Sequence, residues 1–297
     1  MTEKWFTTLR QVVETRTGVS IDADKQYLAE SRLSSLVSKF GAASIQELVD
    51  QLAANAYSDI SRSIVEAMMT GETFFFRDVS QFNRIRDVVI PELIALRQQD
   101  NRLRIWCAAC STGQEPYSIA MMLDEMASEL RGWRIDIVAS DVSESAVERA
   151  RQGYYNQFEV QRGLPVTSLL RYFHRDGDNW RIAENLRSRI EFVSANILTF
   201  RQSGQPFDLV LCRNVLMYFE TETRQEALRN IDENLALDGW IVLGTSESGI
   251  LKNSSYASTR EFPAICRKSA QTFAKEGVIA RNTPAPLVLS LAGKSVH

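Results

Sequence analysis

The sequence of 297 residues has little histidine and no surplus of basic side chains. Only His174 and His297 occur, and 34 Lys+Arg stand against 37 Asp+Glu, for a formal net charge of -3 at pH 7. Proteins that bind nucleic acid generally carry a basic surplus that pairs with phosphates. The charge balance therefore speaks against nucleic acid as a partner.

Long apolar runs are also missing. No uninterrupted stretch approaches the roughly 20 residues that a membrane-spanning helix needs. The first residues, MTEKWFTTLR, lack the apolar segment of a secretory signal. The sequence therefore predicts a cytoplasmic protein that does not insert into a membrane, with a length typical of about two domains.

Cysteine is scarce, but two of the four cysteines, Cys107 and Cys110, form a C-x-x-C pair. A redox pair of this spacing usually opens a helix, whereas Cys107 falls in a predicted strand and Cys110 in the turn after it. A zinc site needs more cysteine or histidine ligands than this region offers. We therefore predict no metal site and interpret the pair as small side chains packed beside a ligand, with redox function as the less favoured alternative.

Apolar residues recur at helical spacing through the first 70 residues. The predicted helices cover about 5–13, 27–40, 45–52 and 60–69. Gly41 is expected to end the second of them. No strand-like alternation interrupts this pattern, so residues 1–70 are predicted to form a small all-α domain.

From about residue 81, helical segments alternate with short apolar runs such as FDLVLC and WIVLG. Continuously apolar runs are typical of strands buried on both faces. The predicted strands are 103–109, 135–140, 190–194, 207–212 and 240–244, and the predicted helices are 82–96, 116–130, 144–152 and 222–235. The alternation predicts an α/β fold with a mostly parallel sheet and right-handed crossovers.

Two segments depart from this alternation. Between 169 and 190, short strand-like pieces flank the turn DGDN, which predicts an antiparallel hairpin inserted into the α/β domain. Residues 269–297 contain TPAP and a polar ending, which predicts a loosely held tail. Residues 71–90 are then a linker with the start of the larger domain, and 91–268 are that domain itself.

The turn after the first predicted strand contains a single glycine, Gly113, in ACSTGQEP. It lacks the G-x-G-x-x-G pattern of a dinucleotide site. S-adenosylmethionine has no pyrophosphate, so a site for it needs fewer glycines. Asp141, at the end of the next strand, is placed to accept hydrogen bonds from ribose hydroxyls, and Glu115, at the start of a helix, to receive an ammonium group. The alternative is that both acids only cap helices.

Polar residues follow other predicted strands. Asn214 follows FDLVLC with Arg213 between them, and Asn196 follows the strand at 190–194. Because strand ends of this kind face the ligand crevice of an open α/β sheet, both amides are candidates to bind adenine or a cofactor carboxylate, with a turn role as the alternative for Asn214. Arg77 follows three phenylalanines in MTGETFFFRD and is predicted to hold a carboxylate.

Together these segments resemble the chemotaxis receptor methyltransferases of the CheR family. The motifs TFFFR, ACSTGQEPYSIA, ASDVSESAVERAR, SANIL and FDLVLCRNVLMYF occur in family order over about residues 5–268. The resemblance implies a Rossmann-like class I methyltransferase domain, a small all-α N-terminal domain and an inserted antiparallel β-subdomain. It further implies methyl transfer from S-adenosylmethionine to glutamate side chains of the cytoplasmic helices of chemoreceptors, with S-adenosylhomocysteine as the product.

The resemblance also implies the residues of the site. Those lining the cofactor are Thr73, Arg77, Glu115, Asp141, Asn196, Ile197, Asn214 and Val215. Arg77 and Tyr218 lie nearest the transferred methyl group, and Arg77 holds the carboxylate of either the substrate or the cofactor. The family often has asparagine at Gly71, and the turn at 176–179 is shorter than in members that grip a C-terminal peptide of the receptor, so such a pentapeptide tether is not expected.

Lys25, Arg32 and Lys39 are spaced by seven residues, which places three cations on one face of the second predicted helix. The spacing leaves a solvated face and a docking strip for an acidic partner equally open, and the resemblance implies a strip that faces acidic receptor helices. Rival interpretations of the whole chain are a methyltransferase for a small-molecule acceptor and a non-catalytic scaffold that binds the cofactor.

Overall fold

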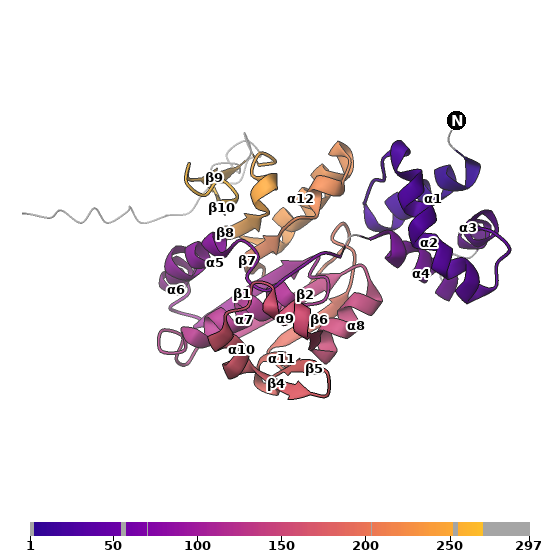
Figure 1. Cartoon of the computed structure of the whole chain (residues 1–297). Helices are drawn as coiled ribbons and strands as arrows, with labels where there is room; N and C mark the ends of the chain where they lie inside the picture. Colours follow the sequence, from indigo (N-terminus) through magenta and orange to yellow (C-terminus); the bar gives the residue numbers. More distant parts are fainter. Residues whose placement is uncertain (1–2, 55–57, 70, 203, 252–254, 270–297) are drawn as a thin grey trace, which may run out of the picture.

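The computed structural model describes residues 3–54, 58–69, 71–202, 204–251 and 255–269. Figure 1 shows four N-terminal helices gathered to one side of a larger sheet domain. They are α1 (Lys4–Thr17), α2 (Gln26–Phe40), α3 (Ile45–Ala54) and α4 (Asp59–Met68). The tail predicted over 269–297 lies, from residue 270 on, outside the described residues.

Glycine and serine residues mark the ends of three of the N-terminal helices. α1 and α2 end at Gly18 and Gly41, whose φ angles of 82° and 64° are accessible to glycine without a Cβ clash. Ser58 begins α4 by accepting a hydrogen bond from the backbone N–H of Ser61. The apolar faces of the helices form a core of their own, which includes Phe6, Leu9, Leu33, Leu48 and Ile64.

A seven-stranded sheet in the order β6-β2-β1-β7-β8-β10-β9 forms the larger domain. The parallel strands are β1 (Arg102–Ala108), β2 (Arg134–Asp141), β6 (Ile190–Ser194), β7 (Phe207–Cys212) and β8 (Leu235–Leu243). β10 (Ile265–Lys268) and β9 (Tyr256–Ser258) extend the sheet antiparallel. The predicted α/β architecture is confirmed, and the strand order reverses between β1 and β7, where such sheets bind ligands.

Helices cover both faces of this sheet (Figure 1). One face packs on α5 (Val79–Arg84), α6 (Ile90–Leu96), α7 (Gln114–Glu125) and α8 (Glu144–Gln152), and the other packs on α12 (Thr221–Asn234). Successive side chains of β1 pack into the hydrophobic cores on opposite faces of the sheet. Ile105 packs into the core on the side of α5 to α8, and Trp106 packs into the core on the side of α12. The carboxyl ends of β1, β2, β6 and β7 therefore open on one rim of a sheet that is buried on both sides.

The helix predicted at 82–96 is a longer run with an interruption. A π-helical turn at Ile85–Val89 separates α5 from α6 and ends two residues before Pro91. Proline has no N–H for the α-helical ladder and its ring crowds the preceding turn, so the chain widens there. The apolar period predicts the helix, but it cannot show where the helix widens.

The predicted hairpin is part of a larger insert. β4 (Phe173–Asp176) and β5 (Asn179–Ile182) pair around the predicted turn, and β3 (Tyr154–Asn156) pairs with the other edge of β5. The short helices α9 (Gln157–Gln161) and α10 (Val166–Tyr172) lie between β3 and β4 in the chain, and α11 (Glu184–Arg187) follows β5. The insert therefore begins at Tyr154, earlier than the expected start at 169, because a strand of three residues carries no readable period.

No helix among the described residues combines the length and the apolar character needed to cross a membrane.

Candidate functional site

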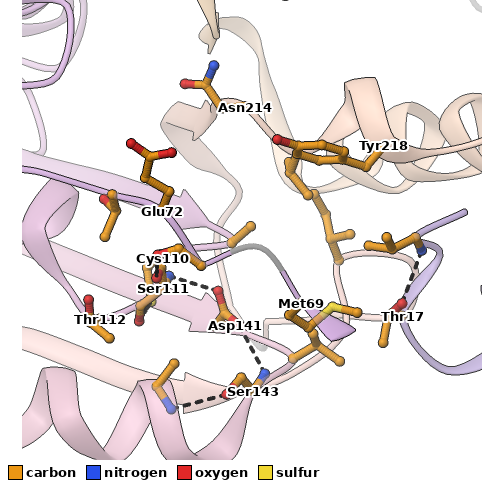
Figure 2. A pocket seen from close by; sticks show the side chains of 18 of the residues that line it. Thr17, Met69, Glu72, Cys110, Ser111, Thr112, Asp141, Ser143, Asn214 and Tyr218 are labelled. Carbon is orange, nitrogen blue, oxygen red and sulfur yellow. Dashed lines mark hydrogen bonds between the residues drawn. The ribbon is translucent and has the colours of Figure 1, made fainter. Parts of the chain in front are cut away.

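One cavity at the carboxyl ends of the parallel strands collects every predicted cofactor and catalytic residue. Its lining includes Thr73, Arg77, Glu115, Asp141, Asn196, Ile197, Asn214, Val215 and Tyr218. The N-terminal domain contributes Thr17, Val19, Glu66 and Met69 to the same wall. Figure 2 shows Asp141 and the turn after β1 on one side, with Tyr218, Met69 and Thr17 on the other. The cavity thus lies between the two domains.

Asp141 joins two loops of this cavity. Its Oδ2 accepts the backbone N–H of Ser111 at 2.7 Å, and its Oδ1 accepts that of Ser143 at 2.9 Å (Figure 2). Burial raises the pKa of this carboxyl, against the lowering effect of the backbone hydrogen bonds. Ser143, and not Asp141, caps α8, by accepting the N–H of Ala146. A carboxylate has about four lone-pair sites, so Asp141 keeps acceptor capacity for a ligand.

The turn between β1 and α7 is tightly wound. Ala109, Ser111 and Gly113 have φ angles of 57°, 49° and 93°. Left-handed backbone at non-glycine residues costs energy and is found mostly where the surrounding structure holds a functional site in place. A Cβ on Gly113 would lie 2.8 Å from the Cβ of Ala150, so a larger residue does not fit beside α8. The small side chains of this turn therefore let its backbone lie close to the cavity.

Arg213 is a buried hub that the sequence indicated only as a polar residue at a strand end. Its guanidinium donates to Glu115 Oε2, Asp78 Oδ2 and Gln81 Oε1, each at 2.9 Å, and also to the carbonyl of Arg77. It thereby joins the end of β7 to the first turn of α7 and to the segment that carries Arg77. Such a buried cation requires these partners, because an unpaired one would be costly.

Glu115 is already paired within the protein. Burial raises the pKa of its carboxyl, and the neighbouring Arg213 guanidinium opposes that rise. Its Oε1 accepts no hydrogen bond from the described residues, while its Oε2 accepts the one from Arg213. Glu115 can therefore offer one oxygen to a cationic ligand group without giving up its internal partner.

Arg77 is carried by a segment anchored in the core. Phe75 is fully buried and meets the rings of Tyr155 and Phe173 edge to face. Arg77 lies over the ring of Phe74, with its guanidinium carbon 5.5 Å from the ring centroid, and donates to the carbonyl of Glu72 at 3.1 Å. The guanidinium is held at the cavity wall and forms no salt bridge with a carboxylate of the described residues. It is therefore available for a ligand carboxylate.

The two asparagines predicted to share one task are held differently. Asn196 donates its Nδ2 to the carbonyl of Arg16 in α1 at 2.7 Å, and its Oδ1 accepts the N–H of Leu198 at 2.8 Å. Asn214 has a φ of 58°, and its buried Oδ1 has no hydrogen-bond partner. A buried acceptor without a donor is costly, so the cavity fits a ligand that brings an amino group, as S-adenosylmethionine does.

The two parts of the chain match two family models. Residues 71–264 match the CheR methyltransferase, SAM binding domain, and residues 4–69 match the CheR methyltransferase, all-alpha domain. The chain belongs to the CheR methyltransferase family. It is therefore an S-adenosylmethionine-dependent methyltransferase of the chemotaxis type, as the motifs predicted.

Curated relatives support this membership across most of the CheR chain. It is 38% identical to chemotaxis protein methyltransferase Cher2 of Pseudomonas putida, over 82% of this chain and 90% of that protein. It is 39% identical to chemotaxis protein methyltransferase 1 of Pseudomonas aeruginosa, over 82% and 89%. The solved N-methyltransferase NodS from Bradyrhizobium japonicum is 20% identical over 55% of this chain and 61% of that chain, with a TM-score of 0.28, a likeness too weak to bear on function.

Glu247 holds the loop after β7 that lines this CheR site, and the sequence did not indicate it. It lies in the short helix η4 (Thr245–Glu247) after β8 and is almost fully buried. Its two oxygens accept the backbone N–H groups of Asn214 at 2.7 Å, Val215 at 3.0 Å, Met217 at 3.0 Å and Gly244 at 2.8 Å. No local pattern marks Glu247, because all the groups that it holds except Gly244 lie some thirty residues away in the sequence.

The C-x-x-C pair of the CheR chain is buried. Cys107 and Cys110 are free thiols, and burial raises the pKa of both well above the ordinary value. A thiol with a raised pKa holds its proton and reacts slowly. This geometry favours the packing interpretation over redox chemistry.

The predicted basic strip is less uniform than its spacing suggests. Lys25 belongs to the 3-10 turn η1 (Ala23–Lys25) before α2 and pairs with Asp22. Arg32 is half-buried and donates to the carbonyl of Met68 at 2.9 Å, which ties α2 to the end of α4. Lys39 is exposed and lies 5.0 Å from the ring centroid of Phe40. Both lysines are exposed, but Lys25 shares its charge with Asp22, so Lys39 presents its charge most openly to a partner.

Proposed function

We propose that this CheR methyltransferase esterifies glutamate side chains on the cytoplasmic helices of a chemoreceptor. The observation that carries the proposal is the presence of Arg77 and Tyr218 in the same cavity as Asp141, Glu115 and Asn214. The acidic and amide groups suit a nucleoside with an amino acid head, and the arginine suits a carboxylate. The relatives are named chemotaxis protein methyltransferases, which supports an acceptor that belongs to the chemotaxis system.

Each lining residue then has a task toward S-adenosylmethionine. Asp141 accepts hydrogen bonds from ribose hydroxyls with its remaining lone pairs, and Glu115 receives the ammonium group with Oε1. Asn214 accepts a hydrogen bond from an amino group, since its buried Oδ1 has no other partner. Asn196 keeps one N–H beyond its bond to Arg16. Thr73, Ile197 and Val215 complete the wall.

The chemistry needs alignment and no general base. S-adenosylmethionine supplies an electrophilic methyl group, to whose carbon a carboxylate oxygen forms a bond as the carbon–sulfur bond breaks and its electron pair stays on sulfur. The acceptor carboxylate is ionised at neutral pH, and no histidine lines the cavity among the described residues. Arg77 orients a carboxylate and Tyr218 bounds the acceptor side, so that catalysis rests on proximity.

The parts of the chain divide this work. We assign donor binding and transfer to residues 91–268 with the linker 71–90. We assign docking of the acidic receptor helices to residues 1–70 through the strip of Lys25, Arg32 and Lys39, in which Lys39 presents its charge most openly. The turn between β4 and β5 is a tight one at Gly177 and Asp178, which supports the expectation that no C-terminal pentapeptide tether is used. A receptor with cytoplasmic helices places the enzyme in the cytoplasm.

Transfer of a labelled methyl group to a receptor cytoplasmic fragment tests the proposal. Wild-type protein should label the fragment, and mild alkali should release the label as methanol, because a glutamyl methyl ester is labile and an N-methyl group is not. Arg77→Ala should lower the transfer rate by about 100-fold through lost alignment. Arg86→Ala, at an exposed arginine paired with Asp87 outside the cavity, is the matched control.

Two results would contradict this assignment. Alkali-stable label would identify another acceptor group. An Arg77→Ala protein with wild-type transfer rate and wild-type affinity for S-adenosylhomocysteine would remove Arg77 from the site.

A further inference from the structure

The loop after β2 is fixed from two sides, and one of them is the N-terminal domain. Asp141 holds the loop by accepting the N–H of Ser143. Glu66 of α4 holds it from across the domain boundary, because its Oε1 accepts the N–H of Ser145 at 3.0 Å and the hydroxyl of Ser143 at 3.2 Å. Ser143 thus bonds both carboxylates, one through its backbone and one through its side chain.

The place of Glu66 on α8 explains why a carboxylate suits this position. Ser145 is the second residue of α8, and the first N–H groups of a helix have no partner inside it. An anion there also meets the positive end of the helix dipole. Arg62, one turn earlier on α4, pairs with Glu144 at the start of α8, so two residues of one α4 face dock on the same helix end.

Glu66 also lines the donor cavity and the neighbouring groove between α4 and α8. It is half-buried and stands at the boundary between the two spaces. The loops after β6 and β7 are held in the same way, since Asn196 bonds Arg16 and the carbonyl of Tyr218 accepts the N–H of Ser20 at 2.8 Å. Three loops of the donor cavity are therefore attached to the N-terminal domain.

We propose that Glu66 is a positioning residue for Asp141, so that docking of the N-terminal domain and binding of the methyl donor stabilise each other. The proposal rests on the proposed role of Asp141 in donor binding. If the domain holds the loop in its binding geometry, donor binding must in turn favour the docked domain by the same factor. Glu66 acts through the loop and is not assigned a contact with the donor.

Calorimetric titration with S-adenosylhomocysteine tests the first half of the coupling. Glu66→Ala should weaken binding about tenfold, in the range of a lost hydrogen bond to a charged group. Glu66→Gln keeps a carbonyl acceptor for Ser145 and should bind within about threefold of wild type. Asp50→Ala, at an exposed residue of α3 that lines neither the donor cavity nor the groove between α4 and α8, is the control and should bind like wild type.

The outcomes separate this proposal from the proposed function. Wild-type affinity in Glu66→Ala would overturn the positioning role, and so would a Glu66→Gln protein as weak as Glu66→Ala, because the retained carbonyl acceptor would then hold the loop without restoring donor affinity. Absence of binding by the wild type would instead overturn the donor site itself. Thermal unfolding of each ligand-free variant shows whether it is folded during the titration.

Hydrogen exchange on the wild type tests the second half without any variant. S-adenosylhomocysteine should slow exchange of amides in α4 and at the end of α1, although these helices belong to the other domain. Unchanged exchange there, with slower exchange in the loop after β2, would overturn the coupling.

Discussion

Two carboxylates near the strand ends, the buried Glu247 and the half-buried Asp141, differ in how fully their acceptor capacity is used. Glu247 accepts four backbone N–H groups, has no acceptor capacity left and does not line the cavity. Asp141 accepts two and faces the cavity with the rest of its lone pairs. Saturation of hydrogen bonds thus distinguishes a carboxylate that holds its loop from one that keeps lone pairs for the ligand-binding role proposed above.

The largest effect should follow removal of the saturated carboxylate. Glu247→Ala leaves four backbone donors in a buried place without their acceptor, which should lower the free energy of unfolding by about 3 kcal/mol or more. Chemical denaturation measures this, and Glu261→Ala, at an exposed glutamate further along the chain, serves as control. A loss of donor affinity with unchanged stability would place Glu247 with the ligand-binding groups and end the distinction.

Asp141→Asn should show the reverse order of effects. Asparagine keeps one acceptor oxygen and the shape of the side chain, so stability should fall by only about 1 kcal/mol. Affinity for S-adenosylhomocysteine should fall by roughly tenfold or more, because the charged acceptor is lost. Calorimetry on this variant and on Asp136→Asn, at the other end of β2, compares the two ends of one strand. Equal affinity in both variants would show that Asp141 only caps its loop.

The smallest effect is a change in the pH dependence of stability. Burial raises the pKa of Asp141 above its ordinary value of 3.8, so the folded protein keeps this proton to higher pH than the unfolded chain. Its contribution to stability is therefore fully present below pH 3.8 and is lost as the pH rises through the folded pKa. The stability of the wild type relative to Asp141→Asn should decline across that window in denaturation curves at several pH values. A rising difference would mean that the hydrogen bonds from Ser111 and Ser143 outweigh burial.

The sequence predicted those parts of the molecule whose signal is local. The apolar runs ending at Asp141 and Cys212 marked strands, and polar residues after them marked the rim where ligands bind. Local patterns could not predict the roles of Arg213 and Glu247, because the partners of these residues come from segments far apart in the chain. The same holds for β3, whose three residues become a strand only by pairing with β5.

The placement of the basic strip shows a different limit. A spacing of seven places Lys25, Arg32 and Lys39 in one line, yet it cannot show which of these cations form contacts within the fold. Arg32 donates a hydrogen bond to the carbonyl of Met68, and Lys25 forms an ion pair with Asp22. Periodicity locates a face, and only tertiary contacts decide what that face offers to a partner.

The burial of all four cysteines has a practical consequence for measuring domain movement. Since the native thiols are enclosed and hold their protons, maleimide dyes react first with thiols introduced on the surface. Ser34→Cys on α2 and Glu226→Cys on α12 put such handles on the two domains at exposed positions. Fluorescence energy transfer between them would report the separation of the two domains, with and without bound donor, with every native cysteine left in place.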